Sequence, residues 1–160
     1  MLFVPLTWWI TLRNGLGAGW FVGHPPLVSL SILLLLFGIF PLQPPAKTSA
    51  TRSKRFDIHQ RTMLGVAMPV MAAGVAAMYI NKHVHSAPHF TTWHSWFGLT
   101  TVAWVVLQAA IGAASVWGEG KAFGGKESAK KVYKWHRYVY RLLARAWVSV
   151  LTPVHQVTPS

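Results

Sequence analysis

Cysteine is absent from this chain of 160 residues, and acidic side chains are scarce. Without cysteine the protein can form neither disulfide bonds nor thiolate metal sites, and no cofactor can be attached through a cysteine pair. Only three aspartate and glutamate residues stand against fifteen lysine and arginine residues, so the formal net charge is +12. This excess raises the question of an anionic partner, and the distribution of the cations along the chain indicates which kind.

Apolar runs dominate the sequence and determine the expected fold. Charged residues make up only 11% of the chain and hydrophobic residues 52%. A helix needs about 20 apolar residues to cross a bilayer, so the pattern predicts an all-α protein, a polytopic transmembrane helical bundle that forms one domain over residues 1–160. Helices are expected at 25–43, 61–81, 95–117 and 136–152, with a partial first helix at 1–12 and a polar tail at 153–160.

The two ends of the chain fit this pattern less well than its middle. The segment 1–12 is too short to cross a bilayer and Pro5 interrupts it, so it is either half of a membrane helix or an anchor in the interface. Near the other end, Arg137, Arg141 and Arg145 recur every four residues and therefore line one stripe of a helix. Because arginine is costly within a bilayer, the segment from Tyr138 either crosses the membrane or lies along its surface.

Basic residues gather in two segments that are predicted to be loops, 44–61 and 118–137. The two clusters are Lys47, Arg52, Lys54, Arg55 and Arg61, and Lys121, Lys126, Lys130, Lys131, Lys134 and Arg137. The other two connections between apolar runs carry only Arg13 and Lys82. Cytoplasmic loops of membrane proteins are enriched in lysine and arginine in this way, so both basic segments are predicted to be cytoplasmic, and nucleic acid is not an expected partner.

One histidine stands at the N-terminal end of each of the four apolar segments: His24, His59, His94 and His136. An ionisable group at membrane depth is costly and is a candidate functional residue, although a single histidine can also simply lie among the lipid headgroups. Successive membrane helices alternate in direction, so the ends that carry His24 and His94 lie on one side of the membrane. The ends that carry His59 and His136 then lie on the other, cytoplasmic side.

Two imidazoles on neighbouring helices suit the two axial positions of a haem iron, for which histidine is a common ligand. The spacing therefore predicts two haems, one ligated by His24 and His94 and the other by His59 and His136. Because the chain has no cysteine, each would be a non-covalently bound haem b. No catalytic side chain is assigned beyond these iron ligands.

The roles of several other polar residues stay open. His83, His85 and His89 follow the helix expected at 61–81 and could bind a metal ion, but a solvated loop explains them as well. Gln108 is a polar residue within an apolar helix, where it could bond a haem propionate or a neighbouring helix.

Four motifs together resemble the cytochrome b561 family. They are Gly23-His-Pro-Pro-Leu27, Phe56-Asp-Ile-His59, His94-Ser-Trp-Phe-Gly-Leu99 followed by Gln108, and Tyr133-Lys-Trp-His136. The resemblance runs from about Gly23 to His136, and the ordered set of four histidines is its most specific part.

This resemblance implies a transmembrane oxidoreductase of six helices, of which the middle four hold two haems b. Members of the short, ascorbate-dependent type carry electrons from cytoplasmic ascorbate to monodehydroascorbate or ferric iron on the exoplasmic or lumenal side. Ascorbate would bind at Lys54, which matches the family by position, with Arg55 and Lys134 beside it. Membrane lipid would surround the bundle, and a homodimer is compatible with the pattern.

Compared with a six-helix pattern, the first helix is expected to be half present and the sixth absent, as in a chain truncated at both ends. The sequence therefore also allows a second function. In this alternative, the chain is a truncated, non-catalytic membrane protein that keeps the topology and binds one haem or none.

Overall fold

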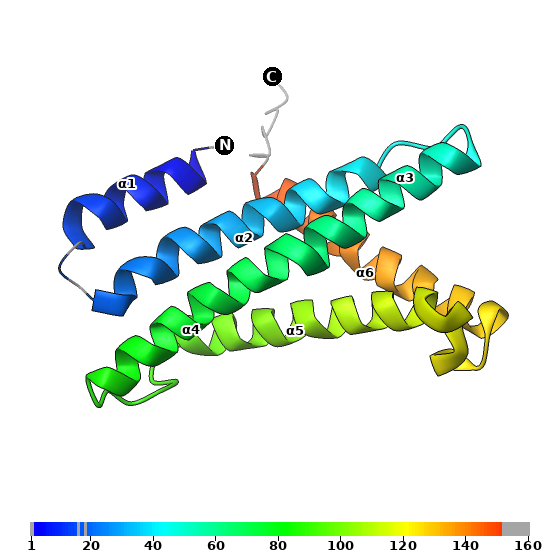
Figure 1. Ribbon diagram of the computed structural model, residues 1–160. Coiled ribbons are helices and arrows are strands. Elements are labelled where there is room, and N and C mark those ends of the chain that lie inside the picture. Colours follow the sequence, from blue (N-terminus) through cyan, green and yellow to red (C-terminus); the bar gives the residue numbers. More distant parts are fainter. Residues whose placement is uncertain (1, 16, 18, 152–160) are drawn as a thin grey trace, which may run out of the picture. The chain divides into compact units, whose positions relative to one another are not determined.

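The computed structural model describes residues 2–15, 17 and 19–151, with the backbone alone for 14, 15 and 139–151. All regular structure in this part of the chain is helical, which confirms the all-α prediction (Figure 1). The tail predicted at 153–160 lies outside the described residues. The chain divides into two compact units, Met1–Trp96 and Phe97–Ser160, and each is described by itself.

Three helical segments are long and apolar enough to cross a membrane: Gly19–Leu42, Ser49–Val84 and Trp93–Phe123. They contain His24, His59 and His94, and they support the prediction of an integral membrane protein. Helix α6 (Lys126–Leu151), which contains His136, is not among them, and the described residues include no further segment of this kind.

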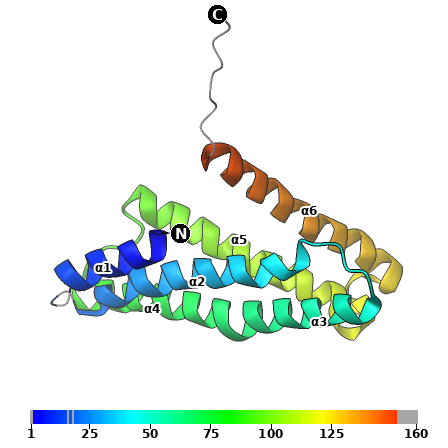
Figure 2. The same cartoon turned by 90° about the horizontal axis from the view of Figure 1, so that it is seen from above.

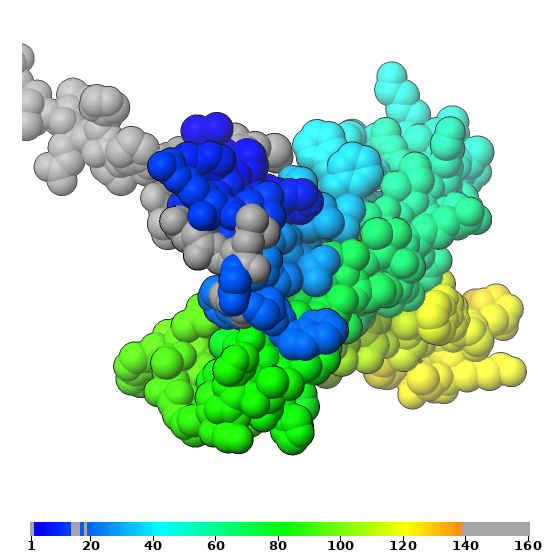
Figure 3. All heavy atoms as spheres, turned by 60° about the vertical axis from the view of Figure 1, so that its left-hand side comes forward, coloured from blue at the N-terminus to red at the C-terminus, as the bar shows by residue number. Residues whose placement is uncertain are grey.

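The first unit begins with α1 (Phe3–Gly15), which packs along α2 (His24–Ile39). The indole Nε1 of Trp8 donates to the Pro26 carbonyl and to the Ser29 hydroxyl, both at 3.2 Å. The space-filling view shows α1, in dark blue, against the lighter blue of α2 (Figure 3). The partial helix expected at the start of the chain is thus present as α1, and it is held by contacts with α2.

Short 3₁₀ helices flank α2. One, η1 (Gly19–Gly23), leads directly into it, and the other, η2 (Phe40–Leu42), ends it. Pro25 and Pro26 occupy the first turn of α2, where a missing N–H leaves no carbonyl unpaired. The whole segment Gly19–Leu42 therefore contains the helix expected at 25–43 and extends it at its N-terminal end.

The basic segment 44–61 is largely helical, contrary to the expectation of a loop. Helix α3 (Ser49–Gln60) begins after Thr48, whose hydroxyl caps it by accepting from the Thr51 N–H at 3.1 Å. Such a cap satisfies a backbone donor that has no partner within the helix. The sequence between Pro45 and Gly65 contains no helix breaker, so the helix continues from the polar segment into the apolar one.

A π-helical stretch joins α3 to the helix that follows. The stretch, η3 (Arg61–Ala67), continues without a break into α4 (Met68–Val84). Pro69 lacks an N–H and its ring displaces the carbonyl four residues earlier, which accounts for the wider turns before it. The helix expected at 61–81 is therefore part of a longer one, Ser49–Val84.

Helices α2 and α4 lie side by side and pack closely through a glycine (Figures 1 and 2). Gly74 is buried, and a Cβ placed there would meet Val28 Cγ2 at 2.9 Å and Leu27 Cβ at 3.0 Å. Ala67 and Ala77 are also buried on this side of the pair. Small residues of this kind let helix backbones approach each other within a membrane, where dispersion contacts stabilise the pair.

The second unit contains most of α5 (Trp93–Val116), a short 3₁₀ helix, η4 (Trp117–Phe123), and α6. Gly118, Glu119 and Gly120 all have positive φ, so the chain turns sharply there. Gly120 lies against Ala129 of α6, and α5 and α6 diverge from this turn (Figure 2). Because α6 begins at Lys126, it starts well before the helix expected at 136–152.

Candidate functional site

The imidazole rings of His24 and His94 lie next to each other in the first unit. His24 is the first residue of α2, and His94 is the second residue of α5. Their ring centroids are 6.2 Å apart and their planes are perpendicular, at 90°. Bonds between a divalent metal ion and an imidazole nitrogen are about 2 Å long, and that nitrogen lies about 1 Å from the ring centre, so two imidazoles on opposite sides of one ion have centroids roughly 6 Å apart. The observed separation fits a shared metal ion.

A hydrogen bond fixes the orientation of His24. Its Nδ1 lies 2.9 Å from the carbonyl oxygen of Gly74 on α4. A carbonyl oxygen can only accept, so Nδ1 carries the hydrogen and donates it, and the free lone pair is on Nε2. Metal-bound histidines commonly donate their second nitrogen to an acceptor of this kind, which holds the ring in place.

His59 forms an equivalent hydrogen bond that runs from the α3–α4 helix back to α2. From α3, its Nδ1 donates to the carbonyl oxygen of Gly38 on α2 at 3.0 Å. His24 and Gly38 are separated by about four helical turns of α2, and His59 and Gly74 by nearly the same interval on the continuous helix of α3 and α4. At a helical rise of about 1.5 Å per residue, the two histidines lie about 21 Å apart along the helix pair.

In the second unit, a side chain provides the acceptor for His136. Its Nδ1 lies 3.0 Å from Oε1 of Gln108 on α5, and its ring lies against Gly112 one turn further along. Of the two roles considered for Gln108, the structure shows the bond to a neighbouring helix. The interval from His94 to Gln108 equals the interval from His24 to Gly38. Three helical segments thus carry a histidine near one end and, about four turns later, an acceptor for another histidine.

Sequence reasoning identified the histidines but missed Gly38 and Gly74 as acceptors. A backbone carbonyl has no residue-specific chemistry, so nothing in the type of residue marks it as a partner of histidine. The recurring interval after each histidine is the one signal that could have found these two glycines. His59 and His136 belong to different units, and their pairing stays a prediction.

The remaining histidines that the structure describes surround Tyr79 and Asn81 near the end of α4. The Tyr79 ring stacks with His83 and His89 at centroid distances of 6.4 and 4.9 Å. The Nδ1 of His85 donates to the Asn81 carbonyl at 2.7 Å. No group of three or more metal-binding side chains that could hold an ion occurs in the described part of the chain, so these residues form no such site here.

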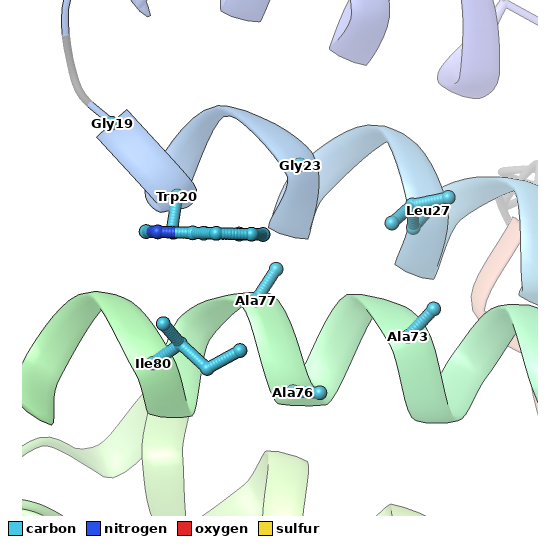
Figure 4. A pocket seen from close by; sticks show the side chains of 8 residues that line it. All are labelled: Gly19, Trp20, Gly23, Leu27, Ala73, Ala76, Ala77 and Ile80. Atoms are coloured by element: carbon cyan, nitrogen blue, oxygen red, sulfur yellow. The ribbon is translucent and has the colours of Figure 1, made fainter.

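An apolar cavity of about 630 Å³ lies between η1 and α4, beside the start of α2. Binding pockets for small molecules and cofactors typically measure about 300–1,000 Å³. In Figure 4, Trp20 extends over α4, and Ala73 and Ala77 point from α4 toward the opposite wall. The small side chains leave room for an apolar group, and neither His24 nor His94 is among the residues that line the cavity. The lining residues are Gly19, Trp20, Gly23, Leu27, Ala73, Ala76, Ala77 and Ile80.

The three residues predicted to bind ascorbate differ in their surroundings. Lys54 on α3 is exposed, whereas Arg55 donates from Nη1 to the Pro44 carbonyl at 2.7 Å and so helps to hold the preceding turn. Lys134 on α6 is exposed and lines a hollow of about 330 Å³ with Arg137 and two tyrosines. It belongs to the second unit, so its place beside Lys54 stays a prediction.

The acidic residues of the chain do not neutralise its cations. The three ion pairs of the described residues are Asp57 with Arg61 at 2.9 Å, Glu119 with Lys126 at 3.2 Å, and Glu127 with Lys130 at 2.6 Å. They use all three acidic side chains of the protein. Within the part that the structure describes, the other lysine and arginine side chains are left without a carboxylate and can attract anions from outside the chain.

Comparison with known protein families gives one match. A family model described as eukaryotic cytochrome b561 matches residues 24–158, which is more than half of the chain. The matched range contains all four candidate ligands and both basic segments. No curated protein and no solved structure matches the chain.

Proposed function

The chain belongs to the eukaryotic cytochrome b561 family, and from this premise we propose that it is an ascorbate-dependent transmembrane oxidoreductase. Membership of the family implies electron transfer across a membrane that depends on haem b. The proposed donor is ascorbate on the cytoplasmic side. The proposed acceptor is monodehydroascorbate or ferric iron on the exoplasmic or lumenal side.

The observation that carries this proposal is the repeated interval between a histidine and the acceptor for another histidine. It separates two levels of histidines by about 21 Å along the helices, within a hydrocarbon core that is about 30 Å thick. One level would therefore lie toward each face of the membrane. His24 and His94 would ligate iron at one level, and His59 and His136 at the other. Haem b supplies an iron centre that takes up and releases one electron at a time.

The groups of the protein itself would hold and insulate the two centres. The carbonyls of Gly74 and Gly38 hold Nδ1 of His24 and His59, which leaves their Nε2 to bind iron, and the side chain of Gln108 holds Nδ1 of His136. The 6.2 Å between the His24 and His94 rings supports a shared iron at the first level. The apolar helices would exclude water from the path between the levels.

The positive charges around His59 indicate the proposed direction of electron transfer, from the side of His59 to the side of His24. Helix α3 carries Arg52, Lys54 and Arg55 within about two turns before His59, and such enrichment is typical of the cytoplasmic side. Ascorbate is an anion at neutral pH, so these cations would attract it. Lys54 is the main proposed contact because its ammonium is exposed, whereas Arg55 is already bonded to a backbone carbonyl. Arg55 and Lys134 would assist it.

Stopped-flow reduction of the purified protein tests this donor site. Lys54→Ala should slow reduction by ascorbate, and the defect should shrink as salt is raised because ions screen the attraction. Arg52→Ala is the matched control, since Arg52 is also exposed on α3 but faces another direction on the helix, and it should have a smaller effect. Reduction by a small neutral reductant should be nearly unchanged in both variants.

Two results would contradict the donor site. Equal loss with ascorbate and with the neutral reductant would give Lys54 a structural role, and equal loss in Lys54→Ala and Arg52→Ala would mean a general effect of surface charge. Haem per chain, measured from the absorption spectrum, separates the whole proposal from the alternative of a non-catalytic protein with one haem or none.

A further inference from the structure

The helix that carries His94 is capped by residues of its own segment. The Thr92 hydroxyl oxygen accepts from the Ser95 N–H at 3.3 Å, and the Ser95 hydroxyl oxygen accepts from the Thr92 N–H at 3.2 Å. This reciprocal pair is a capping box, which closes the first turn of a helix. His94 is the second residue of α5 and lies within that turn, so its backbone is fixed locally.

The helix that carries His24 begins differently. Its N-terminal cap is Gly23, which has no side chain that could accept a hydrogen bond. Pro25 and Pro26 follow His24 and have no N–H that a cap could bind. The preceding segment, η1, is a 3₁₀ helix, whose hydrogen bonds have poorer geometry than those of an α-helix. The local sequence alone therefore leaves the start of this helix weakly held.

A side chain from a neighbouring helix supplies the missing cap. The Phe21 N–H, within η1, donates to Oδ1 of Asn81 on α4 at 3.2 Å. The same oxygen would lie 3.7 Å from a Cβ added at Gly19, so the first residue of η1 also lies close to it. The backbone carbonyl of Asn81 accepts from the His85 N–H at 3.2 Å and from its Nδ1 at 2.7 Å. The side chain of Asn81 thus links the end of α4 to the segment that leads into His24.

Asn81 and Gly74 hold the start of α2 at two separate points. Phe21 precedes His24 by three residues, and Gly74, whose carbonyl accepts from His24 Nδ1, precedes Asn81 by seven. Seven residues are about two helical turns, so the two acceptors lie on the same face of α4, about 10 Å apart along its axis. The chain before His24 therefore runs along this face between two hydrogen bonds.

Two contacts fix the His24 ring more firmly than one. With the bond at Nδ1 alone, the backbone and the ring could pivot about that bond and turn Nε2 away from His94. The second contact, earlier in the chain, fixes the backbone from which the ring extends. With both in place, the two imidazole rings are held with their centroids 6.2 Å apart and their planes at 90°.

We propose that Asn81 is a positioning residue for the iron centre of His24 and His94. It acts through Phe21, whose N–H it holds, and it performs from α4 the role that a local capping box performs at the start of α5. This inference rests on the proposed haem between the two histidines. Loss of the side-chain oxygen of Asn81 should change the angle between the two imidazole planes without removing either ligand.

Electron paramagnetic resonance of the ferric protein tests this role, because the signal of a low-spin haem with two imidazole ligands depends on the angle between their planes. Asn81→Leu keeps the size of the side chain but removes the acceptor, so it should shift the signal that His24→Ala abolishes. It should weaken haem binding by less than the roughly 10–100-fold that is typical of removing a direct partner of a metal ligand. Asn81→Asp retains an oxygen and should keep the signal.

Lys82→Leu is the matched control for this experiment. It also loses a hydrogen bond at this end of α4, but one to the Pro88 carbonyl, so the signal should stay in place. A merely structural role of Asn81 would lower the yield of folded Asn81→Leu and leave the signal of the remainder unchanged. That result, or equal shifts in Asn81→Leu and in either Asn81→Asp or Lys82→Leu, would overturn the proposal.

Hydrogen exchange of the backbone amides of residues 20–24 gives a readout that does not depend on haem. Asn81→Leu should speed exchange there by about fivefold, as expected for the loss of one hydrogen bond, and Asn81→Asp should not. If His24→Ala removes haem but exchange is unchanged in Asn81→Leu, only the role of Asn81 is wrong. If exchange is faster but His24→Ala removes no haem, the proposed haem site is wrong, and Asn81 then positions no iron centre.

Discussion

His24 and His136 are held in different ways although both donate from Nδ1 to an oxygen at nearly the same distance, 2.9 and 3.0 Å. For His24 the acceptor is the backbone carbonyl of Gly74, which is in reach because α2 and α4 pack closely at that glycine. For His136 the acceptor is the side chain of Gln108 on α5. The first arrangement depends on how two helices pack, and the second depends on one residue.

The two sites are therefore vulnerable to different changes. A backbone acceptor cannot be removed by substitution, but it can be displaced if the helices are forced apart. A side-chain acceptor can be removed without disturbing the helices. His59 also has a backbone acceptor, the carbonyl of Gly38, but only side chains crowd that glycine, so its site should be the least vulnerable of the three. Three substitutions should separate the cases.

Gly74→Ala should have the largest effect. The new Cβ would lie 2.9 Å from Val28 Cγ2 and 3.2 Å from the backbone nitrogen of Val28, so α2 itself must move. Overpacking of this kind costs about 1–3 kcal/mol, and the shift would carry the carbonyl away from His24. We expect lower thermal stability and loss of the spectral component that depends on His24. Gly65→Ala is the matched control, since nothing lies within 4 Å of its added Cβ. Equal behaviour of the two variants would refute the role of packing.

Gln108→Leu should have an intermediate effect confined to the His136 site. It leaves Nδ1 of His136 without its acceptor, and loss of such a partner typically weakens metal binding by about 10–100-fold. Gln108→Glu retains an acceptor and should keep the haem, with a lower midpoint potential because of the added negative charge. Haem titration and redox titration of both variants measure this. If Gln108→Leu and Gln108→Glu weaken haem binding equally, the hydrogen bond is not what holds His136.

Gly38→Ala should have the smallest effect. The added Cβ would meet Thr62 Cγ2 at 3.2 Å and Met63 Cε at 3.4 Å, and these are ends of side chains that can shift. We expect a loss of stability below the range of about 1–3 kcal/mol that is typical of overpacking, with both spectral components retained. Thermal unfolding of Gly38→Ala and of Gly74→Ala under the same conditions compares the two losses of stability. Damage as large as that of Gly74→Ala would show that backbone contact does not distinguish the two glycines.

Much of this arrangement could be predicted because membrane helices follow simple rules. Uninterrupted apolar runs predicted helices that begin next to His24 and His94. The structure has a helix at each of these places, and each histidine lies in its first turn. The motifs around the histidines predicted the family, which the family model confirms. The pairing of His24 with His94 followed from alternating helix directions, and the distance between their rings supports it.

Other features could not be predicted, for identifiable physical reasons. Charges at 44–61 indicated a loop, but the segment is helical because charged residues favour helices and Thr48 provides a cap. The carbonyls of Gly38 and Gly74 became acceptors only through the approach of two helices that are distant in sequence. The start of α6 was obscured by lysines, which look alike in a loop and on the exposed face of a helix.

Whether His24 and His94 serve the same iron can be decided from the haem per chain in three variants. His24→Ala and His94→Ala should each remove the same spectral component and the same amount of haem. The double variant should lose no more than either single variant, and the remaining spectrum should be identical in all three. A double variant that loses about the sum of two separate losses would contradict a shared iron, because the two histidines would then belong to different sites.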